Sequence, residues 1–309
     1  MVDEKTEMND PLVTVLMSVY NGEKHLAGAI ESILNQTFKD FEFLIVNDGS
    51  TDSSRNIILS YNDSRMQLID NEMNIGLTRS LNKGLKLARG TYIARMDADD
   101  VSLPARFEKQ VAFMVSNKDV AVCGTCGFYI DHHGILHDDI QMNLNYEDIY
   151  SNIFLKNQLM HGSVIFDRKV IQSLGMYDET YTNAQDYELW LRVLMNGYKI
   201  HNINDRVYYY RINETMNFSE MQEDFACRAL KKILDIYLKY PVNLETIVLF
   251  RKLLKNERIG YYNKIVLLLF IFRLKRKFVR YLNYLGIATV SDCRYAILAG
   301  FDSSIKKIL

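Results

Sequence analysis

The sequence predicts an α/β protein: a mostly parallel sheet with helices on both faces, followed by a C-terminal helical region. Three observations carry this prediction. Over the first 130 residues, short apolar runs rich in β-branched residues alternate with amphipathic stretches. The segment from 119 to about 211 mixes strand and helix patterns. Beyond Met216 every periodic stretch is helical, with Pro241 as a break.

The first predicted strand is Val13–Tyr20, which the turn signal Asn21-Gly22 closes. Apolar runs of this kind are typical of parallel strands that helices cover on both faces. Pro104 stands where a helix should begin, at the first helical position that proline favours. Further strands are expected at 41–46, 66–69, 92–96, 120–130, 163–166 and 207–210, and helices at 26–35, 51–61, 77–88, from 104 onward, 146–156 and 186–196.

Composition excludes several classes of protein. Of the 309 residues, 48% are hydrophobic and 24% are charged, with 3 prolines and 15 glycines, which is the balance of a globular protein and not of collagen or a linker. Four cysteines are too few for a disulfide scaffold. Residues 1–10 are acidic and polar, unlike a secretory signal, and no apolar run reaches about 18 residues. We therefore expect a cytoplasmic protein.

The net charge of -1 conceals an asymmetry along the chain. Residues 226–309 carry 17 Lys and Arg against 5 Asp and Glu, whereas residues 1–225 carry 20 against 33. This difference indicates two units with different roles. We expect one domain at 1–215 and a basic helical region at 216–309.

Polar clusters follow the predicted strands. In an open α/β sheet, the ligand binds at the carboxyl ends of the parallel strands, so residues at this edge are candidates for a site. The segments at the edge are Ser18–Asn21, Asn47–Ser50, Asn71–Gly76 and Asp97–Asp100.

The strongest of these clusters is Asp97-Ala-Asp-Asp100, directly after a predicted buried strand. Three carboxylates in four residues repel one another unless a cation lies among them. Mg²⁺ or Mn²⁺ binds carboxylate oxygens and completes its coordination with substrate phosphates. The alternative is an acidic surface turn in which Asp100 caps the helix that follows Pro104.

Two further motifs lie at element boundaries. In Asn47–Asp52, Asp48 can accept a hydrogen bond from a base or a sugar, or the segment is simply a strand–turn–helix junction. Asp186 begins an apolar helix, where it is a capping residue or a general base. The positive end of the helix dipole favours its ionised form in either role.

In combination these motifs resemble a known family. They are Ser18-Val-Tyr-Asn-Gly22, Asn47–Asp52, Asn74-Ile-Gly-Leu77 with Arg79 and Asn82, Gly90-Thr-Tyr-Ile-Ala94, Asp97–Asp100 and Gln185–Arg192. Over roughly residues 11–212 the chain resembles the family 2 glycosyltransferases, which are inverting enzymes of the Rossmann-like GT-A fold, here of the bacterial type that makes polysaccharides or glycolipids. The resemblance implies a nucleotide-sugar half at about 11–100 and an acceptor half at about 101–215.

The resemblance also implies ligands and residue roles. The donor would be a nucleoside-diphosphate sugar, in particular a UDP-sugar, and the cofactor Mn²⁺ or Mg²⁺. The acceptor would be a glycan or a lipid-linked sugar, and nucleic acid is not an expected partner. Asp186 would be the catalytic base. Asp48 would bind the nucleobase, Asp97 would bind the nucleotide, and Asp99, in the DXD motif, would bind the metal. The other nucleotide-binding residues would be Ser18, Tyr20, Asn21 and Arg79. His161 and Arg211 would contact the diphosphate or the acceptor. Gln185 departs from the Glu of many relatives.

Two other functions stay open. A nucleotidyltransferase should carry a Gly-rich basic loop after its first strand, and Ser18–Lys24 is not one. A catalytically inactive nucleotide-binding or membrane scaffold module should have lost Asp99 or Asp186, and both are present.

The C-terminal region contains the apolar run 265–272, which the basic run 273–280 follows. Eight helical residues span about 12 Å, too little for a hydrocarbon core of about 30 Å. The run is either a buried helix or a segment that lies in the interface of an anionic membrane. In the second case, residues 262–309 would hold the protein on the inner face of the cytoplasmic membrane.

Overall fold

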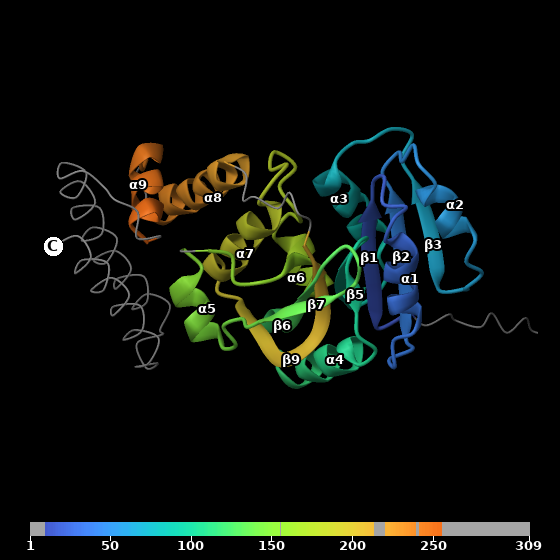
Figure 1. Cartoon of the computed structure of the whole chain (residues 1–309). Coiled ribbons are helices and arrows are strands. Elements are labelled where there is room, and N and C mark those ends of the chain that lie inside the picture. The colour runs from blue at the N-terminus through green and yellow to red at the C-terminus, as the bar shows by residue number, and fades with distance from the viewer. Residues whose placement is uncertain (1–9, 155, 213–219, 239–240, 255–309) are drawn as a thin grey trace, which may run out of the picture. The chain divides into compact units, whose positions relative to one another are not determined.

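The computed structural model describes residues 10–154, 156–212, 220–238 and 241–254, which form two compact units (Figure 1). The first unit holds the described residues of Met1–Met142, Leu159–Thr182 and Ile203–Glu214. The second unit holds those of Asn143–Gln158, Asn183–Asn202 and Thr215–Leu309. Segments of the two units therefore alternate along the chain. The functional division near residue 215 stays a prediction.

The amino-terminal half of the first unit is a parallel sheet with the strand order β3-β2-β1-β4. Every residue of β1 is buried, as expected for a central strand that helices cover on both faces. The predicted alternation of strands and helices is confirmed. The strands are β1 Val13–Val19, β2 Phe41–Asn47, β3 Met66–Asp70 and β4 Tyr92–Asp97, joined by the helices α1 Leu26–Leu34, α2 Ser54–Leu59 and α3 Leu77–Leu87 (Figure 1).

Beyond β4 the sheet becomes antiparallel, so the sheet as a whole is mixed. Phe166 of β8 lies opposite Ile93 of β4 and opposite Val122 of β6, and both pairings are antiparallel. The strand order continues from β8 through β6 and β9 to β5, while β7 pairs with β6. The elements are β5 Val101–Ser102, α4 Arg106–Ser116, β6 Val120–Ile130, β7 Leu136–Ile140, the 3₁₀ helix η1 His161–Ser163, β8 Ile165–Asp167, α6 Arg168–Ser173 and β9 Lys199–Arg211.

Several elements of this half differ from the prediction. The strands β5 and β7 and the helix α6 were not predicted, and β9 begins at Lys199, well before the predicted Val207. Asn and Asp, which disfavour strands, interrupt the start of β9, so its strand conformation depends on tertiary pairing. The placement of Pro104 was also wrong: Ala105 is the N-cap of α4, and Pro104 lies outside the helix.

The second unit is mostly helical in its described residues and also holds the first residues of β9, Lys199–Asn202. Its helices are α5 Tyr146–Asn152, α7 Gln185–Met195, α8 Glu220–Leu238 and α9 Leu244–Leu254 (Figure 1). Helix α7 packs on α8, and α8 packs on α9. Within the part of the chain that the structure describes, no helix is both long enough and apolar enough to span a bilayer. The runs 265–272 and 273–280, on which the membrane prediction depends, lie outside the described residues.

Candidate active site

The carboxyl ends of the parallel strands bring two predicted site residues side by side. Ser18 on β1 is paired in register with Asp97, the last residue of β4. On its other side, Ser18 is paired with Val46 of β2, next to the turn that holds Asp48. The sheet register therefore gathers these residues at one edge, as expected for the ligand edge of an open α/β sheet.

Asp48 is almost completely buried, with 2% of its surface exposed. Its Oδ1 accepts hydrogen bonds from Asn71 Nδ2 (2.8 Å) and Ile75 N (2.9 Å), and its Oδ2 accepts one from Gly76 N (2.9 Å). Asp48 therefore fixes the loop that follows β3. A carboxylate can accept more hydrogen bonds than these three, so a further bond from the nucleobase to Asp48 stays a prediction.

The loops after β1 and β2 are joined by hydrogen bonds. Asn21 N donates to Ser50 Oγ (3.1 Å), and Thr51 N donates to Asn21 Oδ1 (2.8 Å). Asn21 has a φ of 50°, in the left-handed region that Asn tolerates better than most residues. The neighbouring Tyr20 is half exposed, so its ring is accessible at this edge. The two loops thus form a connected rim beside the carboxyl ends of the strands.

Arg79, predicted to bind the nucleotide, lies on α3 with an exposed side chain. Its Nε is 3.6 Å from Glu179 Oε2, and Glu179 Oε1 accepts a hydrogen bond from Asn82 Nδ2 (3.1 Å). The structure therefore pairs Arg79 with a carboxylate of the same unit. A contact from Arg79 to the nucleotide stays a prediction.

The acidic turn rests on a buried arginine that the sequence analysis did not single out. Arg95 Nη2 donates to Asp97 Oδ1 at 2.6 Å, and the Arg95 side chain is only 1% exposed. Burial by itself would raise the pKa of Asp97, but the charges of Arg95 and His161 bring that pKa below its usual value. Asp97 is therefore held in its ionised form. A charged residue inside an apolar strand was the sequence signal for Arg95.

The other two carboxylates of the turn respond in the opposite direction. Burial, and after it the charge of Asp97, raises the pKa of Asp99. Burial and the charges of Asp97 and Asp99 raise the pKa of Asp100 well above its usual value. Asp100 accepts hydrogen bonds from Tyr208 Oη (2.7 Å) and Arg211 N (2.7 Å), so it joins the turn to β9. The alternative in which Asp100 caps a helix was wrong.

Arg211 and His161 both lie against this turn. Arg211 Nε donates to the carbonyl oxygen of Asp99 at 2.6 Å, and Nη1 donates to the carbonyl oxygen of Asp131. His161 Nε2 is hydrogen-bonded to Tyr177 Oη at 2.8 Å. The next residue is Gly162, where a Cβ atom would lie 2.6 Å from Asp97 Oδ2 and 2.0 Å from Tyr208 Oη. Only glycine therefore allows this close approach of η1 to the acidic turn.

Asp186, the predicted base, belongs to the second unit. It lies in the first turn of α7, after the N-cap residue Ala184, which has the left-handed φ of 53°. Asn157 Nδ2 donates a hydrogen bond to Asp186 Oδ2 at 2.6 Å. Asn157 is a residue that the sequence analysis missed, because nothing in its local pattern indicated a contact across 29 positions.

The donor atoms of the acidic turn fit a cation that is shared with substrate. Among the described residues, no group of three or more His, Cys, Asp or Glu side chains could hold a metal by itself. Mg²⁺ and Mn²⁺ need only one or two protein carboxylates when phosphate oxygens supply the remaining ligands. Asp99 would supply one such carboxylate, and a cation at this turn would offset the negative charge of Asp97, which after burial raises the pKa of Asp99.

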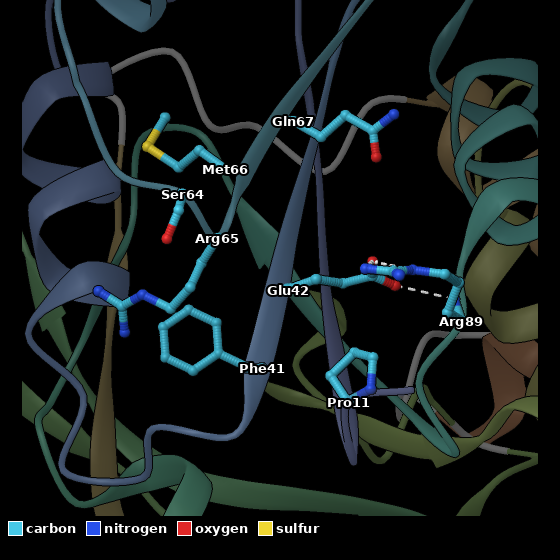
Figure 2. Close-up of a pocket in the computed structure, with 8 residues that line it drawn as sticks. All are labelled: Pro11, Phe41, Glu42, Ser64, Arg65, Met66, Gln67 and Arg89. Atoms are coloured by element: carbon cyan, nitrogen blue, oxygen red, sulfur yellow. Dashed lines mark hydrogen bonds and ion pairs between the residues drawn. The ribbon is translucent and has the colours of Figure 1, made fainter. Parts of the chain in front are cut away.

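A pocket of about 430 Å³ lies at the opposite edge of the parallel strands, at their amino ends (Figure 2). Figure 2 shows Glu42 and Arg89 facing each other, and the guanidinium of Arg65 beside the Phe41 ring. The Cζ atom of Arg65 lies 4.4 Å from the centroid of that ring. Arg89 is bound to Glu42 at 2.7 Å, and Arg65 to Asp63 at 2.7 Å. Since each arginine has a carboxylate partner, the pocket is poorly suited to a diphosphate.

Comparisons with known proteins point to one family. The model of the family described as "Glycosyl transferase family 2" matches residues 14–175. An uncharacterized glycosyltransferase of Methanocaldococcus jannaschii is 39% identical over 217 residues, which cover 69% of this chain and 74% of that protein. The Escherichia coli protein WfaP, named UDP-Glc:alpha-D-GlcNAc-diphosphoundecaprenol beta-1,3-glucosyltransferase, is 31% identical over 206 residues, which cover 65% and 78%.

A solved structure shares the fold. The crystal structure of S. aureus TarS 1-349 in complex with UDP-GlcNAc superimposes with a TM-score of 0.60 over 95% of this chain and 90% of that one. The sequence identity is 17%, so the likeness concerns the fold alone.

Proposed function

The chain belongs to glycosyl transferase family 2 and is a glycosyltransferase, and from that premise we propose that it moves a hexose from a UDP-sugar to a hydroxyl group of a glycan or lipid-linked acceptor. Two similarities support a UDP-sugar donor, and one of them also supports the acceptor. The related WfaP is named for a UDP-Glc donor and a diphosphoundecaprenol-linked acceptor, and TarS was solved with UDP-GlcNAc. The proposed transfer depends on Mn²⁺ or Mg²⁺ and inverts the anomeric configuration.

The observation that carries the proposal is the acidic turn at the end of β4. Ser18 lies beside Asp97 in the sheet, Arg95 keeps Asp97 ionised, and Arg211 is bonded to the backbone of Asp99. In the proposed complex, Asp97 binds the ribose side of the nucleotide, while Asp48, Ser18, Tyr20, Asn21 and Arg79 bind the rest of it. Asp99 would hold the divalent cation, which neutralises charge on the diphosphate when it is bound.

Asp186 is the proposed general base. An acceptor hydroxyl is a weak nucleophile, and removal of its proton during the attack makes the oxygen reactive. The proton passes to the Asp186 carboxylate as the new bond forms between the acceptor oxygen and C1 of the sugar. The bond between C1 and the phosphate oxygen breaks, and UDP leaves. A single displacement of this kind needs one carboxylate and inverts the anomeric carbon. His161 and Arg211 are proposed contacts to the diphosphate or the acceptor.

The test is a donor screen that detects released UDP, followed by mass spectrometry of the product. UDP-glucose, UDP-galactose and UDP-GlcNAc are offered with GlcNAc-diphosphoundecaprenol, in Mn²⁺ and in EDTA. We expect Mn²⁺-dependent UDP release and a product heavier by one hexose or N-acetylhexosamine. Release of pyrophosphate from a nucleoside triphosphate would instead support the nucleotidyltransferase. UDP binding by calorimetry, without turnover of any donor, would support the inactive module.

A further inference from the structure

The structure gives Asp186 a side-chain partner within its own unit. Asn157 Nδ2 donates to Asp186 Oδ2 at 2.6 Å, and both side chains are partly buried. From this contact we infer that Asn157 is a positioning residue, which orients the Asp186 carboxylate toward the acceptor hydroxyl. The inference rests on the proposed role of Asp186 as the base.

The position of Asn157 is fixed by its neighbour Gln158, of which only 2% is exposed. Gln158 Oε1 accepts a hydrogen bond from Asn143 Nδ2 (2.8 Å), and its Nε2 donates to the carbonyl oxygen of Asn152 (3.1 Å). Its own carbonyl oxygen accepts a bond from Asn202 Nδ2 (3.0 Å). Three bonds to three different parts of the unit therefore hold the backbone that carries Asn157.

Asp186 is fixed from the other side, at the start of α7. Ala184, two residues earlier, has a left-handed conformation, which is unfavourable for a residue with a Cβ and persists only where the surroundings enforce it. Tyr187 Oη donates to the carbonyl oxygen of Ile153 at 2.8 Å. Two consecutive residues of α7 thus bond to the segment that carries Asn157, so the start of α7 and the Asp186 carboxylate are held next to Asn157.

This geometry divides the work between the two carboxylate oxygens. Of the side chains that the structure describes, Asn157 is the one that donates to Asp186, and its N–H group occupies Oδ2. Oδ1 is then the atom that takes the proton of the acceptor hydroxyl, as the oxygen–C1 bond forms and UDP departs. Asn157 stays neutral throughout and gives up no proton. A base that a third group orients is the usual arrangement for activating a hydroxyl nucleophile.

The decisive variant is Asn157→Leu, which keeps the approximate shape and removes the N–H donor. Its matched control is Asn152→Leu in the same segment, because Asn152 Nδ2 donates to the carbonyl oxygen of Asp148 (2.8 Å) and not to Asp186. With UDP-glucose and GlcNAc-diphosphoundecaprenol, or the pair that the donor screen identifies, we expect Asn157→Leu to lower kcat about 10- to 100-fold. UDP affinity and the unfolding temperature should stay close to those of the control.

A second background separates positioning from a purely structural role. If Asn157 acts only through the Asp186 carboxylate, adding Asn157→Leu to an Asp186→Ala protein lowers kcat no further. If the two residues act independently, the fold losses of kcat multiply. Asn157→Asp, which also lacks the donor but keeps the size, should show the same non-additivity if Asn157→Leu folds poorly. Near wild-type turnover by Asp186→Ala would overturn the base role in the proposed function. Two results would overturn the role of Asn157, given that Asp186→Ala itself lowers kcat. The first is an equal kcat for Asn157→Leu and Asn152→Leu. The second is a double variant Asn157→Leu/Asp186→Ala whose loss of kcat is the product of the two single losses.

Discussion

At the scale of single residues, the acidic turn shows how a buried charge organises a site. Arg95 lies inside β4, where a charged side chain is costly unless it is paired. Its ion pair with Asp97 Oδ1 gives each charge a partner of opposite sign, and Gly162 allows η1 to lie against the other carboxylate oxygen. The site therefore depends on residues behind the ligand edge as well as on those that line it.

The pairing predicts a large effect for Arg95→Met. The substitution removes the buried cation and leaves Asp97 without its partner, so we expect the free energy of unfolding to fall by about 3 kcal/mol. Urea denaturation at pH 7 measures the change. Adding Asp97→Asn should restore part of the lost stability, because it removes the charge that Arg95 balanced. A double variant no more stable than Arg95→Met would show that Arg95 acts through its packing.

A second prediction concerns Asp99→Ala. Burial, and after it the charge of Asp97, raises the pKa of Asp99 in the folded protein above its pKa in the unfolded chain. The ionised carboxylate therefore destabilises the folded protein when the pH lies above the folded-state pKa. This loss of stability disappears as the pH falls to the unfolded-state pKa. In EDTA at pH 7 the variant should therefore unfold at a slightly higher temperature than the wild type, and the difference should shrink in acid.

Calorimetry should give the Asp99→Ala variant the same UDP affinity in Mn²⁺ as in EDTA. The wild type is the control, and its UDP affinity should be higher in Mn²⁺ than in EDTA. Equal UDP affinity of the wild type with metal and with EDTA would contradict the assignment of Asp99 as the metal ligand.

At the scale of elements, α7 is held by ion pairs and by contacts with the helices that follow it in sequence. Glu188 on α7 is fully buried and accepts bonds from Arg192 Nη2 (2.6 Å) and from Lys232 Nζ on α8 (2.9 Å). Arg251 on α9 is paired with Glu223 of α8. Helices α7, α8 and α9 all lie beyond residues 14–175, which the family model matches, and Lys232 of α8 is bonded to the helix that carries Asp186.

This packing predicts that Lys232→Met lowers the free energy of unfolding by about 1–2 kcal/mol, since it removes a hydrogen bond to a buried carboxylate. The matched control is Lys231→Met. Lys231 is paired with Asp235 one turn along the same helix, a type of pair that contributes about 0.5 kcal/mol. Urea midpoints measure both variants. Equal effects of the two substitutions would mean that the bond to Glu188 adds nothing to the stability of α7.

At the scale of the whole molecule, the basic C-terminal region predicts binding to an anionic membrane surface, where a lipid-linked acceptor would lie. The run 273–280 holds five Lys and Arg, and each basic group near an anionic surface contributes about 1 kcal/mol of binding. We predict that the full chain co-sediments with phosphatidylglycerol vesicles and not with phosphatidylcholine vesicles. Salt at about 0.5 M should weaken the binding, because it screens surface charges.

Removal of residues 262–309 should abolish this sedimentation while UDP binding persists, since the acidic turn lies in the first unit. Binding to both kinds of vesicle alike, or undiminished binding by the shortened chain, would assign the region to packing within the protein.

The sequence by itself determined the parallel half of the fold and the local position of each acidic motif. Continuous apolar strands such as Val13–Val19 and helices of clear period depend on short-range patterns, and the turn residues that follow them depend on local backbone chemistry. The positions of Asp48 and Asp97 at the carboxyl ends of strands and of Asp186 at a helix start were therefore predictable.

Tertiary structure alone decided the antiparallel half and the partners of the acids. Strand β9 begins with polar residues whose conformation depends on pairing with distant strands, and Arg95, Gly162 and Asn157 acquire their roles only through contacts with Asp97 or Asp186. The physical reason is that burial, pKa and hydrogen-bond geometry depend on which side chains meet in space, and local sequence patterns do not specify these individual contacts.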